Sequence, residues 1–138
     1  MCLSIEIHRP QDVLGSGEHS GFQWRVIHNG MGYRCGYVRV PVGHPWHGKH
    51  YDDVDADVHG SLTFAEPDED CGKGGEDNAY WVGFDCAHYG DNPDPDLPFG
   101  RTHMRIDDPN GRVRSQEYVE SQCRSLCEQA AKAAEPVV

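Results

Sequence analysis

The sequence has no long apolar run and no cysteine pair with the C-x-x-C spacing. A membrane-spanning helix needs about 20 consecutive apolar residues, and no window approaches that length, so we expect no membrane insertion. The first residues, MCLSIEIHRP, lack the basic start and apolar run of a signal peptide. We therefore expect the six cysteines to be free thiols in a reducing cytoplasm.

Basic side chains are nearly absent from the middle of the chain. The formal net charge is −11, and residues 52–96 hold 14 acidic side chains against one lysine, Lys73. Such a surface repels nucleic acid and attracts cations, metal ions and basic protein surfaces. Direct nucleic-acid binding is therefore not expected, although the acids could equally serve only to keep a small protein in solution. The segment CGKGGED lacks the following Ser or Thr of a P-loop.

The length and composition predict one domain rich in strands and turns. A chain of 138 residues buries roughly two thirds of its unfolded surface in a single core. Hydrophobic residues make up 37% of the chain, and 16 glycines and 9 prolines favour turns over a helical bundle. We expect residues 1–138 to form a single domain.

Alternating apolar side chains predict an α+β fold with an antiparallel sheet of about five strands. The clearest unit is a hairpin in which FQWRVIH and YRCGYVRV flank the turn residues NGMG. Glycines and polar residues predict a loop over residues 11–21. The other expected strands cover residues 3–7, 52–64, 80–86 and 102–106, and DDPNGR reads as a turn.

One helix is expected, from about residue 115 to residue 134. Ser115 is a suitable N-cap, and Glu117 places an anion in the first turn, where the helix dipole favours it. An apolar stripe at helical spacing predicts that this helix covers one face of the sheet. The stripe consists of Val119, Cys123, Leu126, Cys127, Ala130 and Ala134.

The two strands on either side of the acidic loop at residues 66–78 carry histidine and aspartate on one face. In DDVDADVHGSLTF the valines alternate with aspartates and His59. If this run pairs with AYWVGFDCAHYGD as a hairpin, His59 lies opposite or diagonal to Asp85, and His88 lies near the same edge. A register slip of one residue would separate these groups.

Four residues form the predicted metal-binding set, namely Asp57, His59, Asp85 and His88. Imidazole nitrogen with carboxylate oxygen suits zinc, iron or manganese, and an open position would hold water for hydrolysis. Without metal, an Asp-His pair could act in acid/base chemistry. A purely structural alternative is that the histidines bond loop backbone and hold the turns at Gly60 and Gly90.

The histidine-rich segment HPWHGKH is a weaker candidate. His44, His47 and His50 recur every third residue, but Pro45 blocks a regular helix, so the spacing does not place them on a common face. We interpret them as loop histidines.

Four stretches resemble, in order, a family of small uncharacterised proteins of bacteriophages and bacteria: GYVRVPVGHPWHGKHYDD, DVDADVHGSLTF, WVGFDCAHYGD and YVESQCRSLCEQ. The similarity covers about residues 36–130 and centres on the motifs DVHG(G/S)LT and GFDxAHxGD. This chain departs from the pattern with Ser61 and Tyr89, and with histidine at positions 47 and 50. The resemblance implies a shared fold and no known activity. It also implies a shared ligand-binding site at His59, Gly60, Asp85, His88, Gly90 and Asp91.

Three functions remain open at this point. The first is a phage-type accessory protein, located in the host cytoplasm if phage-encoded, that presents a His/Asp pocket to a small ligand or a host protein. The second is a metal-dependent hydrolase that uses His59, Asp85 and His88. The third is an acidic inhibitor that imitates nucleic acid and binds a basic host protein. The sequence does not decide whether the protein is an enzyme.

Overall fold

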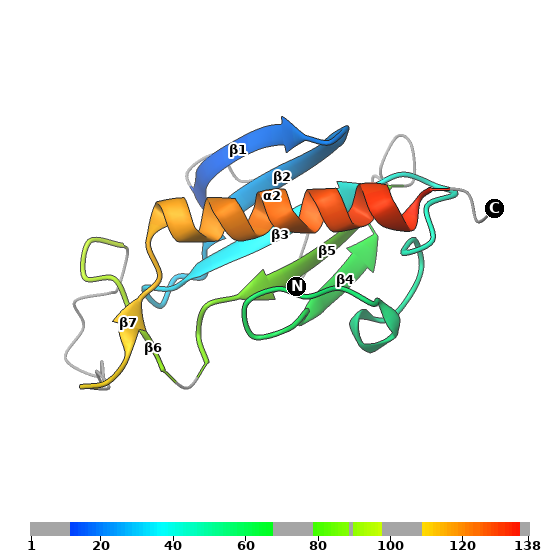
Figure 1. Cartoon of the computed structure of the whole chain (residues 1–138). Coiled ribbons are helices and arrows are strands. Elements are labelled where there is room, and N and C mark those ends of the chain that lie inside the picture. Colours follow the sequence, from blue (N-terminus) through cyan, green and yellow to red (C-terminus); the bar gives the residue numbers. More distant parts are fainter. Residues whose placement is uncertain (1–11, 68–78, 89, 98–108, 136–138) are drawn as a thin grey trace.

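A computed structural model describes residues 12–67, 79–88, 90–97 and 109–135. It shows the predicted α+β architecture, in which the helix α2, Gln116–Ala133, lies across one face of a five-stranded antiparallel sheet (Figure 1). The strand order is β1-β2-β3-β5-β4. The strands are β1 Val13–His19, β2 Phe22–His28, β3 Arg34–Val40, β4 Phe64–Pro67 and β5 Tyr80–Asp85, and a short parallel pair joins β6 Asp91–Asn92 to β7 Arg112–Val113.

The hairpin of β2 and β3 confirms the clearest strand prediction. Trp24 lies opposite Val38, and the ladder continues to His28 opposite Arg34. The connecting turn contains Gly30 and Gly32, both with positive φ, a conformation that glycine adopts without steric cost.

The expected loop at residues 11–21 is wrong, because most of it forms the strand β1. This strand pairs antiparallel with β2 through a tight turn in which Ser20 and Gly21 both have positive φ. The glycines of this segment suggested a loop, but in the strand they allow neighbouring side chains to pack closely against the backbone. A Cβ atom on Gly17 would lie 2.8 Å from the ring of Trp24.

The expected strand at residues 52–64 is also wrong, because β4 begins only at Phe64. The preceding segment instead lies along α2. Gln129 accepts a hydrogen bond from the backbone N–H of Asp57 at 2.7 Å and donates one to its carbonyl at 2.8 Å. Gln122 accepts from the N–H of His59 at 2.9 Å. Side-chain amides of the helix thus replace a neighbouring strand, while the apolar side chains still enter the core, namely Val54, Val58 and Leu62.

The pairing expected between His59 and Asp85 does not occur. Residues 80–85 form a strand as predicted, but the observed register places Phe64 opposite Gly83 and Pro67 opposite Tyr80. His59 precedes this ladder and Asp85 lies beyond its end. Any contact between the histidines and aspartates therefore comes from loops at the sheet edge.

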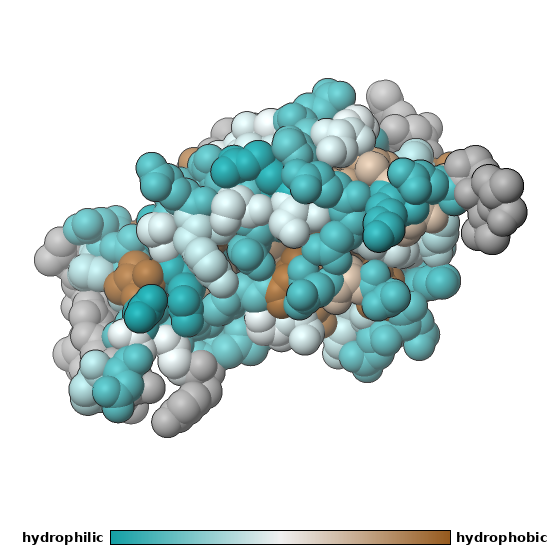
Figure 2. Space-filling model, viewed as in Figure 1, coloured by the Kyte–Doolittle hydropathy of each residue, from teal (hydrophilic) through white to brown (hydrophobic). Residues whose placement is uncertain are grey.

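The helix confirms its prediction. The hydroxyl of Ser115 accepts a hydrogen bond from the N–H of Tyr118, as an N-cap does. Ala134 is the exposed C-cap. The face of α2 turned away from the sheet is largely hydrophilic (Figure 2). Within the described residues, no helix combines the length and the apolar character that crossing a membrane would require. The residues buried against the sheet are Val119, Cys123, Leu126, Cys127 and Ala130.

The four cysteines in the described residues are buried and free, as expected. Burial raises the pKa of Cys123 and of Cys127 to about 12, so both remain thiols at neutral pH. The strands expected at residues 3–7 and 102–106 lie outside the described residues. The turn expected around DDPNGR is seen at Pro109 and Asn110.

The histidines of HPWHGKH do not gather at one point. His44 is buried, with Nε2 2.8 Å from the carbonyl oxygen of Ala130, and its Nδ1 accepts a hydrogen bond from the N–H of Trp46. The ring of His47 packs against Tyr80, and His50 caps the short 3-10 helix Tyr51–Asp53. These contacts of the three histidines hold in place the loop that precedes the 3-10 helix.

We predict that His44 makes the fold sensitive to acid. Its burial lowers its folded-state pKa below the ordinary value of 6.5. Below pH 6.5 the unfolded chain therefore binds a proton that the folded chain does not, and stability falls by at most about 1.4 kcal/mol per pH unit. Urea unfolding at pH 7.5 and 5.5 should show a larger loss in the wild type than in His44→Gln. Equal losses would show that His44 does not contribute.

Candidate functional site

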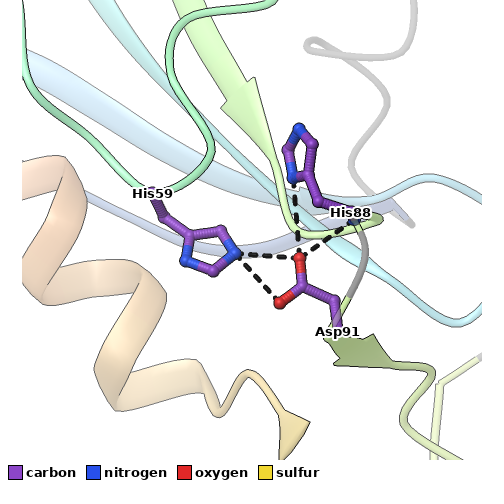
Figure 3. Close-up of side chains that lie close together, drawn as sticks. All are labelled: His59, His88 and Asp91. Carbon is purple, nitrogen blue, oxygen red and sulfur yellow. Dashed lines mark hydrogen bonds and ion pairs between the residues drawn. The ribbon is translucent and has the colours of Figure 1, made fainter. Parts of the chain in front are cut away.

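A buried carboxylate, that of Asp91, lies at the centre of the candidate site (Figure 3). Its side chain is only 1% exposed. Nε2 of His59 lies 2.8 Å and 3.0 Å from its two oxygens. Nε of Arg114 donates to Oδ1 at 2.7 Å, and the backbone N–H of His88 donates to Oδ2 at 3.0 Å. Donors from three separate segments therefore converge on one carboxylate.

Local backbone structure brings Asp91 and Arg114 together. The chain turns sharply after β5, where Gly90 has a φ of +92° and the N–H of Asp91 donates to the carbonyl of His88 at 2.8 Å. Asp91 then begins β6, which pairs in parallel with β7. Arg114 follows directly after β7 and just before α2. The short strand pair therefore positions the ion pair.

His59 is held from both sides. Its backbone N–H is bound by Gln122, and its Nδ1 lies 2.8 Å from the hydroxyl of Tyr118. The next residue, Gly60, has a φ of +67° and packs against the ring of His88. A Cβ atom at Gly60 would lie 2.3 Å from Cε1 of that ring. Glycine is thus required both for the turn and for the approach of the two histidines.

His88 has a buried nitrogen that lacks a hydrogen bond. Its Nδ1 is buried and has no hydrogen-bond partner among the described residues, although it lies 3.5 Å from Oδ2 of Asp91. Its Nε2 lies 3.5 Å from Oδ1 of Asp85, whose other oxygen accepts a hydrogen bond from Thr63 at 3.1 Å. The side chain of His88 is 34% exposed. A buried polar atom without a hydrogen bond is uncommon in folded proteins, and a bound water or ion is one way to satisfy it.

The charges at the site are well defined at neutral pH. Burial by itself would raise the pKa of Asp91, but hydrogen bonds from His59, Arg114 and the backbone of His88 outweigh it and hold that pKa below its ordinary value. The hydrogen bond to Asp91 raises the pKa of Arg114. Burial raises the pKa of Tyr118. The site therefore combines a carboxylate, a guanidinium and a neutral phenol.

The structure brings some of the expected site residues together and not others. His59, His88 and Asp91 form the cluster, Gly60 and Gly90 shape its turns, and Asp85 lies behind His88. Asp57 stays outside it, exposed and bonded through its backbone to α2.

Sequence reasoning missed Arg114 and Tyr118. Arg114 had no pattern to mark it, while Tyr118 lies in the stretch YVESQCRSLCEQ that was used only for the resemblance. Both lie at the N-terminal end of α2, so only the packing of that helix reveals their role.

The cluster has a donor set suited to a transition metal. One nitrogen each from His59 and His88 and one oxygen from Asp91 lie within 4.8 Å of one another. Two imidazoles and a carboxylate are ligands typical of zinc and of other divalent transition metals. The same contacts also form a hydroxyl-imidazole-carboxylate chain through Tyr118, His59 and Asp91, which could transfer protons without metal.

No family model matches this chain, and no curated protein or solved structure shows detectable similarity to it. The functional argument therefore depends on the geometry of the site.

Proposed function

We propose that this chain is a small binding module whose ligand is a divalent transition metal, held by His59, His88 and Asp91. The observation that carries the proposal is Nδ1 of His88, which is buried beside a carboxylate oxygen and forms no hydrogen bond within the part of the chain that the structure describes. A metal between the two rings and Oδ2 of Asp91 would satisfy it. A phage-type accessory role is the other part of the proposal, and its support is the resemblance of the sequence motifs.

Each proposed ligand has a second group behind it. The hydroxyl of Tyr118 lies against His59, and Arg114 donates to the carboxylate oxygen of Asp91 that faces away from His88. Asp85 lies behind His88 at the longer distance of 3.5 Å. Protein metal sites use such outer groups to orient their ligands. With Nε2 of His59 on the metal, its Nδ1–H would donate to the Tyr118 oxygen, since a hydroxyl also accepts.

The charges favour zinc over manganese or calcium. Arg114 already offsets the charge of Asp91, so a hard cation that depends on carboxylate charge gains little there. Imidazole nitrogen contributes two of the three donors, and nitrogen donors bind zinc more tightly than manganese. We therefore expect zinc to bind more tightly than manganese.

Zinc titration of untagged protein tests the proposal. Calorimetry should show one zinc per chain. His88→Ala should weaken zinc binding at least about 100-fold, because one of the three protein ligands of the metal is lost. His50→Ala is the matched control, since His50 is an exposed histidine outside the cluster, and it should bind like the wild type. Absence of zinc binding by the wild type, or equal affinity in His88→Ala, would refute the proposal.

Hydrolysis is the second candidate function. Three protein ligands would leave a fourth position for water, as in hydrolytic zinc sites, and the side chain of His88 is 34% exposed at the edge of the cluster. Zinc-loaded protein would then cleave an activated ester or phosphodiester, and chelation or His88→Ala would abolish turnover. Zinc binding without turnover would favour the binding module.

A further inference from the structure

Arg114 offers hydrogen-bond donors beside the proposed metal centre. Its Nε donates to Oδ1 of Asp91, and its guanidinium lies over the ring of Tyr118, 5.4 Å from the centroid. Its two terminal nitrogens make no hydrogen bond to any described residue, and the side chain is 25% exposed. A guanidinium carries five N–H groups in a planar fork, so most of its donors remain available.

The surroundings of Arg114 favour an anion despite the acidity of the chain. Arg114 directly precedes the N-cap of α2, where the helix dipole is positive. The negative charge of Asp91 is already offset by the positive charge of Arg114. Among the described residues, Asp85 lies beside His88, Glu117 is exposed in the first turn of α2, and Asp94 is paired with Arg34 at 2.9 Å. With a divalent metal on the cluster, the metal, Arg114 and Asp91 together would be net positive at the point where the anion binds.

We propose that the metal centre binds the oxyanion group of a ligand, a phosphate or a carboxylate, with Arg114 as the second anchor. One oxygen of the anion takes the metal position left open by the three protein ligands, and another accepts hydrogen bonds from the terminal nitrogens of Arg114. Arginine forks match both kinds of oxyanion. This inference rests on the proposed metal function and specifies the ligand class of the same site.

Cobalt-loaded protein provides the test, because Co²⁺ reports its coordination in its visible spectrum. Inorganic phosphate and acetate are titrated separately at constant ionic strength, with chloride as the reference anion. We expect a saturable spectral change with at least one of the two oxyanions. The anion that binds more tightly then shows whether the ligand belongs to the phosphate or to the carboxylate class.

Arg114→Gln should weaken oxyanion binding at least about tenfold, the value of one good charge-assisted contact. Arg112→Gln is the matched control, since Arg112 is exposed two residues earlier, and it should leave oxyanion affinity unchanged. Cobalt affinity is measured first for each variant. If Arg114→Gln fails to fold, Arg114→Lys keeps the charge and loses the fork, and we expect severalfold weaker binding.

The outcomes separate the two proposals. Cobalt binding by the wild type without any oxyanion response would overturn this inference and leave the metal site intact. Equal losses in Arg112→Gln and Arg114→Gln, or wild-type affinity in Arg114→Lys, would also overturn it. Failure of the wild type to bind cobalt or zinc would overturn both.

Discussion

Asp91→Ala is expected to destabilise the protein by about 3 kcal/mol and to abolish metal binding. The substitution removes the acceptor for His59, for Arg114 and for the backbone N–H of His88. Breaking a fully buried charge pair costs more, but Arg114 is 25% exposed and can turn to solvent. Urea unfolding without metal measures the stability term, and zinc titration of the folded variant measures the binding term.

Asp57→Ala is the control for Asp91→Ala. It removes the same charge from an exposed position whose contacts with α2 are made by the backbone. Its stability should stay within about 0.5 kcal/mol of the wild type, and its zinc affinity should not change. If both variants unfold at the same urea concentration, Asp91 does not hold the three segments together.

Gly60→Ala is expected to weaken zinc binding at least about tenfold while the protein stays folded. The new Cβ would lie 2.3 Å from Cε1 of His88, so the ring must move away from the cluster. His88 is 34% exposed, which lets it swing into solvent at little cost in stability. A non-glycine residue at a φ of +67° adds about 1–2 kcal/mol of backbone strain.

Gly48→Ala separates that backbone strain from the displacement of the ring. Gly48 has a φ of +80°, and a Cβ atom there would meet nothing within 4 Å. We expect a similar loss of stability in urea unfolding and unchanged zinc affinity. Zinc binding that is equally tight in both glycine variants would show that the position of His88 against Gly60 is not needed.

Local signals explain which elements could be predicted. Ser115 capped the helix as expected, and Gly30 and Gly32 formed the turn of the predicted hairpin. These features depend on residues that are close in sequence. The strand prediction for residues 52–64 failed because Gln122 and Gln129, far along the chain on α2, bind backbone groups of this segment. Strand periodicity alone does not reveal such a partner.

By itself, the sequence determined the α+β class, the helix and the central hairpin. It also indicated that the segments around His59 and His88 contribute histidine and aspartate to a candidate site. Those properties follow from periodicity, caps and turns. Only the tertiary structure decided that Asp91 takes the place that the predicted metal-binding set gave to Asp57, and that Arg114 and Tyr118 contact the cluster. The reason is that these groups come from three segments, which meet only when α2 packs on the sheet and β6 pairs with β7.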